Sequence, residues 1–311
     1  MAHPSLSIVI PAYNAGEFIS SAVRSCLDVG RISQEIIVID DGSTDETIEL
    51  CSSFADKIRL VRLQNGGVSR ARNTGAAMAS GEWLLFLDAD DRLEPDGPSV
   101  LLEAARDKQA GVAYGLVKEH RRPPMGARVT GQNYAEGIPP HPGLRNYWRC
   151  AVITPGSAVI RRELHQKIGG FVPGYEPMED RDYWIKAGLL HSFAHIDRIV
   201  LDKTWRPVSA GKMEARRIWN GLRSRLALPK WCAVEGIPWP DELPRDEAAL
   251  LEKAVNEAVW CKCWGLAGVL LRECRERKLR SFWILRAAAE FYLRGGARAN
   301  PAPPWLLPLP A

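Results

Sequence analysis

The chain has 311 residues, of which 46% are hydrophobic and 25% are charged, and its formal net charge is +4 at pH 7. This composition excludes a largely disordered chain, and so small a net charge gives no reason to expect a nucleic-acid partner. No stretch approaches the roughly 18 uninterrupted apolar residues of a membrane span, and the first residues carry no basic segment of a secretory signal. The seven cysteines follow no disulfide framework, so we expect a cytoplasmic protein with reduced thiols.

Strands and helices are predicted to alternate through the first 115 residues. Short apolar runs, typical of buried parallel strands, cover 6–10, 35–39, 58–63 and 83–87. Apolar residues recur at helical spacing over 15–29, 44–54, 68–79 and 97–108. The alternation predicts an α/β fold with a sheet covered on both faces. Polar residues follow each strand, at the edge where open α/β sheets bind ligands.

The pattern changes twice in the rest of the chain. The segment 118–150 is irregular and rich in Pro, Gly and Arg, which predicts a loop with weak strands. Further elements are predicted as a strand over 152–161, helices over 162–168 and 179–190, and one or two strands over 194–205. From about residue 212 the period is helical as far as 295, apart from a proline-rich break at 227–244. We therefore expect a first domain over 1–211 and a helical extension over 212–311.

The extension carries the basic charge of the chain, with 17 Lys and Arg against 11 Asp and Glu over 212–311. Residues 213–226 form a basic amphipathic stretch, which could lie on an anionic membrane surface or pack against the first domain or a second subunit. We favour packing. Cys261, Cys263 and Cys274 lie in a helical stretch without a nearby histidine, so buried thiols are favoured over a zinc site.

Three carboxylates, Asp88, Asp90 and Asp91, directly follow the strand predicted over 83–87. Clustered like charges repel one another, so such a group costs stability unless a cation offsets it. Hard oxygen ligands in this number suit Mg²⁺ or Mn²⁺, often shared with substrate phosphates. The alternative is an acidic loop in which Asp91 or Asp96 caps the next helix. The position after a strand favours a site for metal and diphosphate.

Two neighbouring strands end in groups that could hold a nucleoside. The first strand is closed by Pro11, Ala12, Tyr13 and Asn14. Backbone and an aromatic ring at this point could flank a flat base, although a plain turn into the next helix is the alternative. Asp40, at the end of the second strand, can accept a hydrogen bond from a base or a ribose hydroxyl. Ser43 and Glu46 have the spacing of a capping box, and both interpretations can hold together.

A glycine-rich loop over 65–73 leads into the helix predicted at 68–79. Gly66, Arg70 and Arg72 offer backbone N–H groups and two guanidinium groups to an anionic diphosphate. The loop lacks the spacing G-x-x-x-x-G-K-[ST], which counts against a nucleotide-hydrolysing P-loop. It also lacks G-x-G-x-x-G, which counts against a dinucleotide dehydrogenase.

Glu179 and Asp180 begin the helix predicted over 179–190. The helix macrodipole favours the ionised form of a carboxyl group at this end. An ionised aspartate that faces a bound hydroxyl can act as a general base. The alternative is a group of acidic residues that lies at a helix N-terminus without a catalytic role, with Asp180 as the cap.

Together these groups resemble the family 2 inverting glycosyltransferases with the GT-A fold, over about residues 5–206. The resemblance is carried by 7–14, 37–45, 65–75, 81–91, 156–158, 168–171 and 179–180. It implies a Rossmann-like mixed, mainly parallel sheet flanked by helices, with the helical extension outside the family's pattern. Many members have an Arg followed by His and Ser after the last strand. Here Arg206 is followed by Pro207, Val208 and Ser209, without a histidine.

The resemblance also implies roles for single residues. Pro11, Tyr13 and Asp40 would hold the base, commonly uracil, and Asp88 would meet the ribose. Asp90 would bind the divalent metal, with Asp88 as the candidate second ligand. The implied nucleotide-binding set is Pro11, Ala12, Tyr13, Asn14, Asp40, Gly66, Arg70, Arg72, Asp88 and Ala89. Asp180 would take the proton from the acceptor hydroxyl, with Glu179 in support.

The implied activity is a metal-dependent, inverting transfer of a sugar from a nucleotide diphosphate sugar, with UDP favoured and Mn²⁺ or Mg²⁺ as cofactor. The expected acceptor is a glycan or lipid-linked glycan in bacterial surface polysaccharide biosynthesis. Peripheral contact with the inner face of the membrane and a homodimer remain open. The alternatives are a catalytically silent sugar-nucleotide-binding scaffold, which the intact acidic motifs disfavour, and a nucleotidyltransferase, which would not need Glu179 and Asp180.

Overall fold

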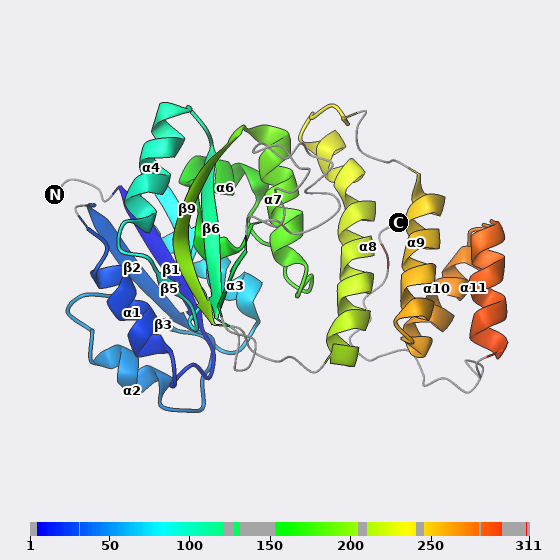
Figure 1. The fold of residues 1–311 in the computed structure, drawn as a ribbon, viewed down its shortest axis with the longest axis horizontal. Coiled ribbons are helices and arrows are strands. Elements are labelled where there is room, and N and C mark those ends of the chain that lie inside the picture. Colours follow the sequence, from blue (N-terminus) through cyan, green and yellow to red (C-terminus); the bar gives the residue numbers. More distant parts are fainter. Residues whose placement is uncertain are drawn as a thin grey trace. The chain divides into compact units, whose positions relative to one another are not determined.

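The structure is a computed structural model that describes residues 5–30, 32–120, 127–130, 153–204, 210–240, 246–279, 281–293 and 309. The chain divides into two compact units (Figure 1). The first comprises Met1–Gly174 and Glu179–Arg206, and the second comprises Tyr175–Met178 and Pro207–Ala311. A sheet with its helices forms the first unit, and helices form the described part of the second.

Within the described residues, the first unit contains a nine-stranded mixed sheet in the order β3-β2-β1-β4-β8-β6-β9-β5, with β7 paired to β6. The strands are β1 (Leu6–Ala12), β2 (Gln34–Asp40), β3 (Arg59–Arg62), β4 (Trp83–Phe86), β5 (Arg92–Leu93), β6 (Val112–His120), β7 (Ala127–Thr130), β8 (Ala158–Arg161) and β9 (Phe193–Thr204). Strands β1 to β4 pair in parallel, whereas β8 is antiparallel to both β4 and β6. The predicted α/β fold with a mixed sheet is confirmed.

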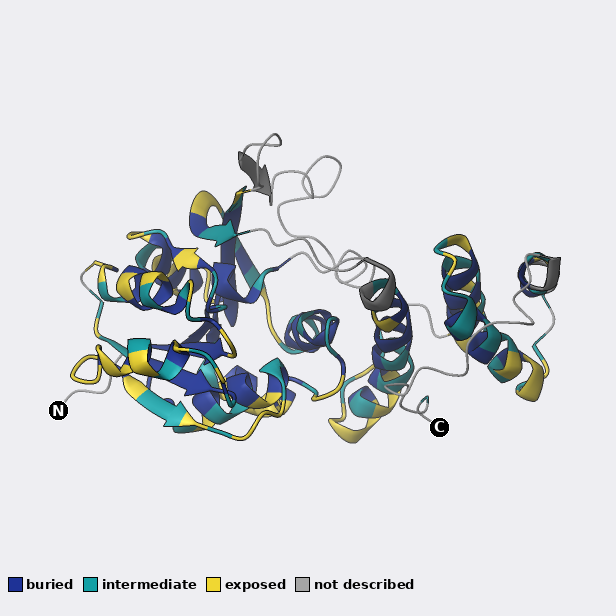
Figure 2. Cartoon of the chain, turned by 90° about the horizontal axis from the view of Figure 1, so that it is seen from below, coloured by how far each residue is buried: buried dark blue, intermediate teal, exposed yellow. Residues whose placement is uncertain are grey.

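Helices cover both faces of this sheet. They are α1 (Ile19–Leu27), α2 (Thr47–Ser52), α3 (Val68–Met78), α4 (Gly97–Asp107), α6 (Arg162–Ile168) and α7 (Glu179–Leu190), with a short 3-10 turn, η1, at Pro155–Ser157. Because side chains alternate along a strand, Ile8 and Ile10 of β1 join the core cluster that includes Ile19 of α1. Val9 faces α3 instead, where a Cβ on Gly75 would collide with it. Figure 2 shows the strands buried between helices whose outer sides are exposed.

Several elements of the first unit are shorter than predicted, among them the helix predicted over 15–29, which covers only Ile19–Leu27. The helix predicted over 44–54 begins only at Thr47, because the polar atoms of Ser43 and Thr44 bond to Asn14 instead of to a helical turn. The predicted capping box is therefore wrong, and Asp45 accepts the Thr47 N–H in its place. The strand predicted over 152–161 is confined to β8, which follows the η1 turn. By contrast, α7 covers the predicted range 179–190.

The second unit is helical over its described residues, with α8 (Ala210–Val234), α9 (Glu247–Trp260), α10 (Trp264–Glu276) and α11 (Phe282–Leu293). Helix α9 packs against α8, α10 and α11, and buries Leu251 and Val255. The break predicted from 227 is wrong over its first residues, since α8 continues through Pro229. Among the described residues, no helix is both long and apolar enough to cross a membrane.

Candidate active site

Three parallel strands bring the predicted nucleoside-binding and acidic groups to one edge of the sheet. In the register of β1 and β2, Ala12 lies opposite Asp40, and in that of β1 and β4, Val9 lies opposite Phe86. The carboxyl ends of these strands therefore lie side by side. Pro11 and Ala12 are buried at this edge, whereas the next residue, Tyr13, leaves 53% of its surface exposed.

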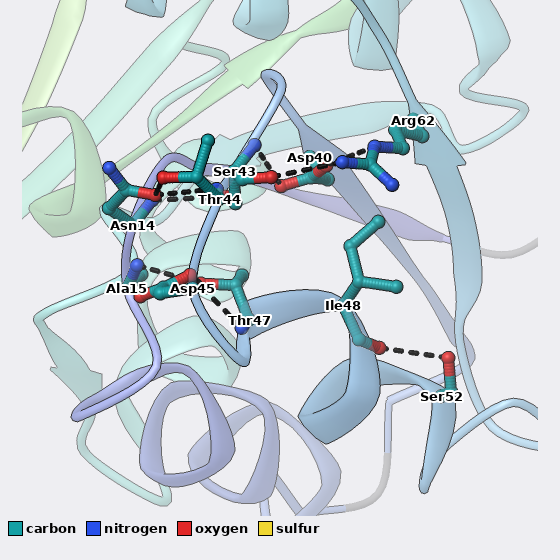
Figure 3. A network of polar contacts seen from close by, with 10 residues as sticks. All are labelled: Asn14, Ala15, Asp40, Ser43, Thr44, Asp45, Thr47, Ile48, Ser52 and Arg62. Atoms are coloured by element: carbon teal, nitrogen blue, oxygen red, sulfur yellow. Dashed lines mark hydrogen bonds and ion pairs between the residues drawn. The ribbon is translucent and has the colours of Figure 1, made fainter.

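Hydrogen bonds hold the loops that follow β1 and β2 together (Figure 3). The N–H of Asn14 donates to Ser43 Oγ at 3.0 Å, and Asn14 Oδ1 accepts the N–H of Thr44 at 2.8 Å. Asp40 is fully buried, and its Oδ1 accepts the N–H of Ser43 at 3.1 Å. We call Asn14, Asp40, Ser43 and Thr44 the nucleoside side of the site.

The second carboxylate oxygen of Asp40 faces a different environment. Asp40 Oδ2 lies 3.4 Å from Nε of Arg62, whose side chain is 61% exposed. Within the described residues, this buried oxygen accepts no hydrogen bond. It therefore retains the capacity to accept one from a ligand.

The glycine-rich loop is already partly engaged by the protein. Asp41 accepts the N–H groups of Gly66 and Gly67 at 2.9 and 2.8 Å, through one carboxylate oxygen each. Arg70 is exposed and donates to the carbonyl of Gln64 at 3.3 Å. The N–H groups expected to cradle a diphosphate at the first two glycines are therefore used to fix the loop before α3.

Arg72 of α3 joins two acidic motifs that are far apart in the sequence. Its Nη2 donates to Asp88 Oδ1 at 2.7 Å, and its Nη1 donates to Glu179 Oε1 at 2.9 Å. The guanidinium also lies 5.0 Å from the centre of the Phe171 ring. Burial acts to raise the pKa of Asp88, but the charges of Arg72 and Lys203 and the hydrogen bond from Arg72 together outweigh it and hold that pKa below its ordinary value. The arrangement brings the end of β4 and the start of α7 to one place.

Asp180, the predicted general base, lies partly buried at the first turn of α7. Its Oδ1 accepts the N–H of Arg181 at 2.7 Å. Burial, together with the neighbouring charge of Glu179, raises the pKa of Asp180 to about 7, although Arg72 and Lys203 oppose this change. A carboxyl group that titrates near neutral pH is suited to accept a proton during a reaction.

Asp91 and Lys203 complete this part of the site. Asp91 is 1% exposed, and its Oδ1 accepts the N–H of Thr204 at 3.2 Å. Burial, with the charges of Asp88 and Asp90, raises the pKa of Asp91 to about 8. Lys203 interacts electrostatically with four carboxylates of the site and was not indicated by any sequence motif. The signal that could have indicated Lys203 is its position at the carboxyl end of the last predicted strand. We call Arg72, Asp88, Asp90, Asp91, Glu179, Asp180 and Lys203 the acidic side of the site.

The acidic side fits a divalent cation that shares its coordination with a substrate. Over the residues that the structure describes, no group of three or more His, Cys, Asp or Glu is arranged as a complete metal site. Hard oxygen donors are nevertheless present on Asp88 and Asp90, and Asp91 Oδ2 is buried without a hydrogen-bond partner in the described part of the chain. Magnesium sites commonly use one or two carboxylates together with substrate phosphates. The residues therefore suit a metal that binds together with a diphosphate.

A family profile decides which family the chain belongs to. The profile described as Glycosyl transferase family 2 matches residues 7–169, just over half of the chain. The chain belongs to glycosyltransferase family 2. The matched range contains the nucleoside side and the Asp88–Asp91 loop, whereas Glu179 and Asp180 lie beyond its end.

The matches to curated relatives of this family 2 glycosyltransferase cover only part of each relative. A chondroitin synthase of Pasteurella multocida is 28% identical over 64% of this chain, and a chondroitin synthase of Escherichia coli is 36% identical over 73%. Glycosyltransferase GlyG of Streptococcus pneumoniae is 33% identical over 52% of the chain. The chain spans 20% of the length of the Pasteurella synthase, 34% of the Escherichia synthase and 58% of GlyG.

Two solved structures are similar in fold to this chain. Staphylococcus aureus TarS 1–349 in complex with UDP-GlcNAc is similar over 94% of this chain and 89% of its own, with a TM-score of 0.66 and 19% identity. A mannosyltransferase of Pyrobaculum calidifontis with GDP-Man and Mn²⁺ is similar over 96% and 87%, with a TM-score of 0.58 and 17% identity. At this identity the likeness concerns the fold.

Some predicted features lie outside the described residues. The departure after Trp205 and Arg206, where a histidine is missing, is one of them. Most of the acceptor segment predicted over 118–150 is another, since only 118–120 and 127–130 of it are described. Of the predicted donor-site and base residues, all lie in the described part, and Arg72, Asp88, Glu179 and Asp180 are brought together there.

Proposed function

We propose that this chain is a metal-dependent, inverting glycosyltransferase, which transfers a sugar from a nucleoside diphosphate sugar, with a UDP-sugar favoured, to an acceptor hydroxyl. The ion pairs of Arg72 carry the proposal, because they join Asp88 on the donor side to Glu179 beside the predicted base. A carboxyl group with a pKa of about 7, that of Asp180, is thereby held next to the diphosphate end of the donor site.

The nucleoside side supports binding of a flat base. The exposed ring of Tyr13 offers a face on which a base can stack. Asp40 Oδ2 can accept a hydrogen bond from an N–H of the base or from a ribose hydroxyl. The proposed nucleotide-binding residues are Pro11, Ala12, Tyr13, Asn14, Asp40, Gly66, Arg70, Arg72, Asp88 and Ala89. Because Asp41 already accepts the N–H of Gly66, we expect this glycine to contribute a close approach of backbone instead of a hydrogen bond.

Asp90, with Asp88 as a second ligand, would hold Mn²⁺ or Mg²⁺ together with the diphosphate oxygens. When bound, such a cation neutralises charge that grows on the leaving diphosphate. The presence of hard carboxylate oxygens next to a buried, unpartnered oxygen of Asp91 supports this assignment.

The reaction follows from the proposed base. Asp180 accepts the proton of the acceptor hydroxyl while the hydroxyl oxygen forms a bond to the anomeric carbon of the sugar. The bond from that carbon to the diphosphate breaks, and its electron pair leaves with the nucleoside diphosphate. Attack from the face opposite the leaving group inverts the configuration. Glu179 supports Asp180 by raising its pKa and by pairing with Arg72.

For the acceptor, we propose a glycan or lipid-linked glycan in bacterial surface polysaccharide biosynthesis. The named relatives support this choice, since they include chondroitin synthases and a succinoglycan biosynthesis protein of Rhizobium meliloti. For the extension over 212–311 we propose an internal packing role. Contact with the inner face of the membrane and formation of a homodimer are the alternatives.

Calorimetric titration of the purified chain with UDP, with and without Mn²⁺, tests the donor site. We expect Mn²⁺-dependent binding that Asp90→Asn weakens by at least tenfold. Asp107→Asn, an exposed aspartate at the end of α4, is the matched control and should bind as the unaltered chain does. UDP-sugars would then be screened for release of UDP, and the configuration of the product determined.

Other results would change the proposal in defined ways. If UDP does not bind, GDP and deoxythymidine diphosphate follow, and binding of either changes the base but keeps the class. Failure of all three nucleotides would favour the silent scaffold. Release of pyrophosphate in place of a nucleoside diphosphate would indicate a nucleotidyltransferase.

A further inference from the structure

Lys203 is brought to the acidic side by the topology of the sheet. Strand β8 is antiparallel to both β4 and β6, and β9 is parallel to β6, so β9 runs in the same direction as β4. The carboxyl end of β9, where Lys203 lies, is therefore at the same edge as Asp88. Two local contacts fix the end of β9 there. Strand β5, which directly follows Asp91, pairs with β9 so that Arg92 lies opposite Asp202, and Thr204 donates its N–H to Asp91.

The negative charges around Lys203 come from two separate parts of the fold. Asp88, Asp90 and Asp91 follow β4, and Asp180 belongs to α7, and all four interact electrostatically with the Lys203 ammonium. Burial acts to lower the pKa of Lys203, but these carboxylates outweigh it and raise that pKa above its ordinary value. Arg72, by contrast, is committed to its ion pairs with Asp88 and Glu179. Lys203 thus brings a second positive charge into a cluster of carboxylates.

A divalent metal would need some of the same carboxylates. An ammonium group and a metal ion that share their ligands compete, because each is stabilised by the same negative charge and each repels the other. A diphosphate changes this balance, since its oxygens can bind the metal and the ammonium at the same time.

We propose that Lys203 is a resident cation of the acidic side, which opposes binding of a divalent metal until a nucleoside diphosphate is present and then binds the diphosphate itself. This inference rests on the proposed donor, a nucleoside diphosphate. Lys203 thereby couples metal to donor: metal binds weakly to the free protein and tightly to the protein with its nucleotide. In the reaction, the ammonium adds positive charge at the leaving group, where negative charge accumulates.

The test compares Mn²⁺ binding to the full chain with and without saturating UDP, by calorimetry and by electron paramagnetic resonance of free Mn²⁺. In the unaltered chain, UDP is expected to tighten Mn²⁺ binding by at least 100-fold. Lys203→Met, which removes the charge and keeps the length of the side chain, should bind Mn²⁺ at least tenfold more tightly without UDP. It should bind UDP at least tenfold more weakly when Mn²⁺ is saturating.

Two variants serve as controls. Lys203→Arg keeps the charge and should stay close to the unaltered chain in both affinities. Lys57→Met, at an exposed lysine between α2 and β3, should change neither. Thermal unfolding of each variant checks that it is folded.

Failure of this inference is distinct from failure of the proposed function. If the unaltered chain binds UDP with Mn²⁺ but Lys203→Met leaves Mn²⁺ affinity without UDP unchanged or weaker, the role of Lys203 is overturned and the donor site stands. If the unaltered chain binds neither UDP, GDP nor deoxythymidine diphosphate with Mn²⁺, the proposed function itself fails. The proposed competition between Lys203 and the metal is also overturned if neither the unaltered chain nor Lys203→Met binds Mn²⁺, with or without UDP.

Discussion

The nucleoside side and the acidic side lie at the same sheet edge but are stabilised in different ways. On the nucleoside side, backbone N–H groups and hydroxyls satisfy most polar atoms, as in the bonds of Asn14 to Ser43 and Thr44. On the acidic side, the ion pairs of Arg72 join the motifs, and Asp91 Oδ2 and Glu179 Oε2 are buried without a hydrogen-bond partner among the described residues. The carboxyl pKa values raised to about 7 and 8 also belong to the acidic side.

This difference shows which part of the site depends most on a ligand. The hydrogen bonds of Asn14 to Ser43 and Thr44 fix the two loops at little cost, so the loops of the nucleoside side are formed in advance, with Asp40 Oδ2 left to accept from a ligand. Buried charges of like sign cost free energy unless a counter-charge accompanies them. The acidic side is therefore the part that a bound ligand of positive charge would stabilise most. Groups with perturbed pKa values of this kind are typical of functional sites.

The largest effect is expected from Asp180→Asn, which removes the proposed base and keeps the shape of the side chain. We expect kcat to fall about 10³-fold, within the range that a general base contributes, because the acceptor proton then has no receiving group. The affinity for UDP with Mn²⁺ should change less than threefold. Steady-state kinetics and calorimetry of the same sample measure both quantities. A variant that retains kcat would remove Asp180 from the mechanism.

Arg72→Gln should have the next largest effect, because it removes the ion-pair partner of both Asp88 and Glu179. Removal of one partner from a buried ion pair typically costs 3–5 kcal/mol, so we expect the free energy of unfolding to fall by about 3 kcal/mol. Urea denaturation measures the change. Arg70→Gln, two residues earlier on the same helix and exposed, is the matched control and should change stability by less than about 0.5 kcal/mol. Equal effects of the two variants would show that the ion pairs of Arg72 contribute nothing to the free energy of unfolding.

Much of the fold could be predicted from local sequence patterns. The apolar runs at Leu6–Ala12 and Gln34–Asp40 and the helical period at Glu179–Leu190 indicate elements that the structure contains. Local patterns failed where a distant residue or the wider helix decides the outcome. Asn14 is hydrogen-bonded to Ser43 Oγ and to the N–H of Thr44, the groups at which a helix over 44–54 would begin. Helix α8 continues through Pro229.

The candidate site divides in a similar way. Carboxylates such as Asp40 and Asp88 could be predicted, because parallel strands bring their carboxyl ends together. The pairing of Arg72 with Glu179 could not, since 107 positions separate the two residues and no sequence period connects them. Lys203 also escaped prediction, because the direction of β9 depends on the antiparallel strand β8 between β4 and β6.

The pH dependence of activity depends on the electrostatics of the acidic side. The pKa of Asp180 is about 7, so half of this base is protonated and inactive at that pH. We expect kcat/KM to fall tenfold for each pH unit below about 6 and to level off above about 8. Burial has the largest influence on this pKa, and the charges of Glu179, Arg72 and Lys203 modify it. Glu179→Gln removes a negative neighbour and frees Arg72, so it should lower the midpoint by roughly one pH unit.

A pH–rate profile over pH 5 to 9, recorded with and without Glu179→Gln, measures the shift. Asp107→Asn again serves as a control that should leave the midpoint in place. A midpoint that moves upward in Glu179→Gln would contradict the assigned environment of Asp180. So would a profile that is flat across this range.

The smallest effect is expected on the nucleoside side, from Ser43→Ala. The variant removes the hydroxyl that accepts the N–H of Asn14, while Asp40 still accepts the N–H of residue 43. The loss of one neutral hydrogen bond should lower the free energy of unfolding by about 1 kcal/mol. Because no ionisable group is removed, urea denaturation at pH 6 and at pH 8 should give the same difference from the unaltered chain. A loss that differs between the two pH values would mean that the two sides are electrostatically coupled through Asp40, and that the division between them is weaker than their contacts indicate.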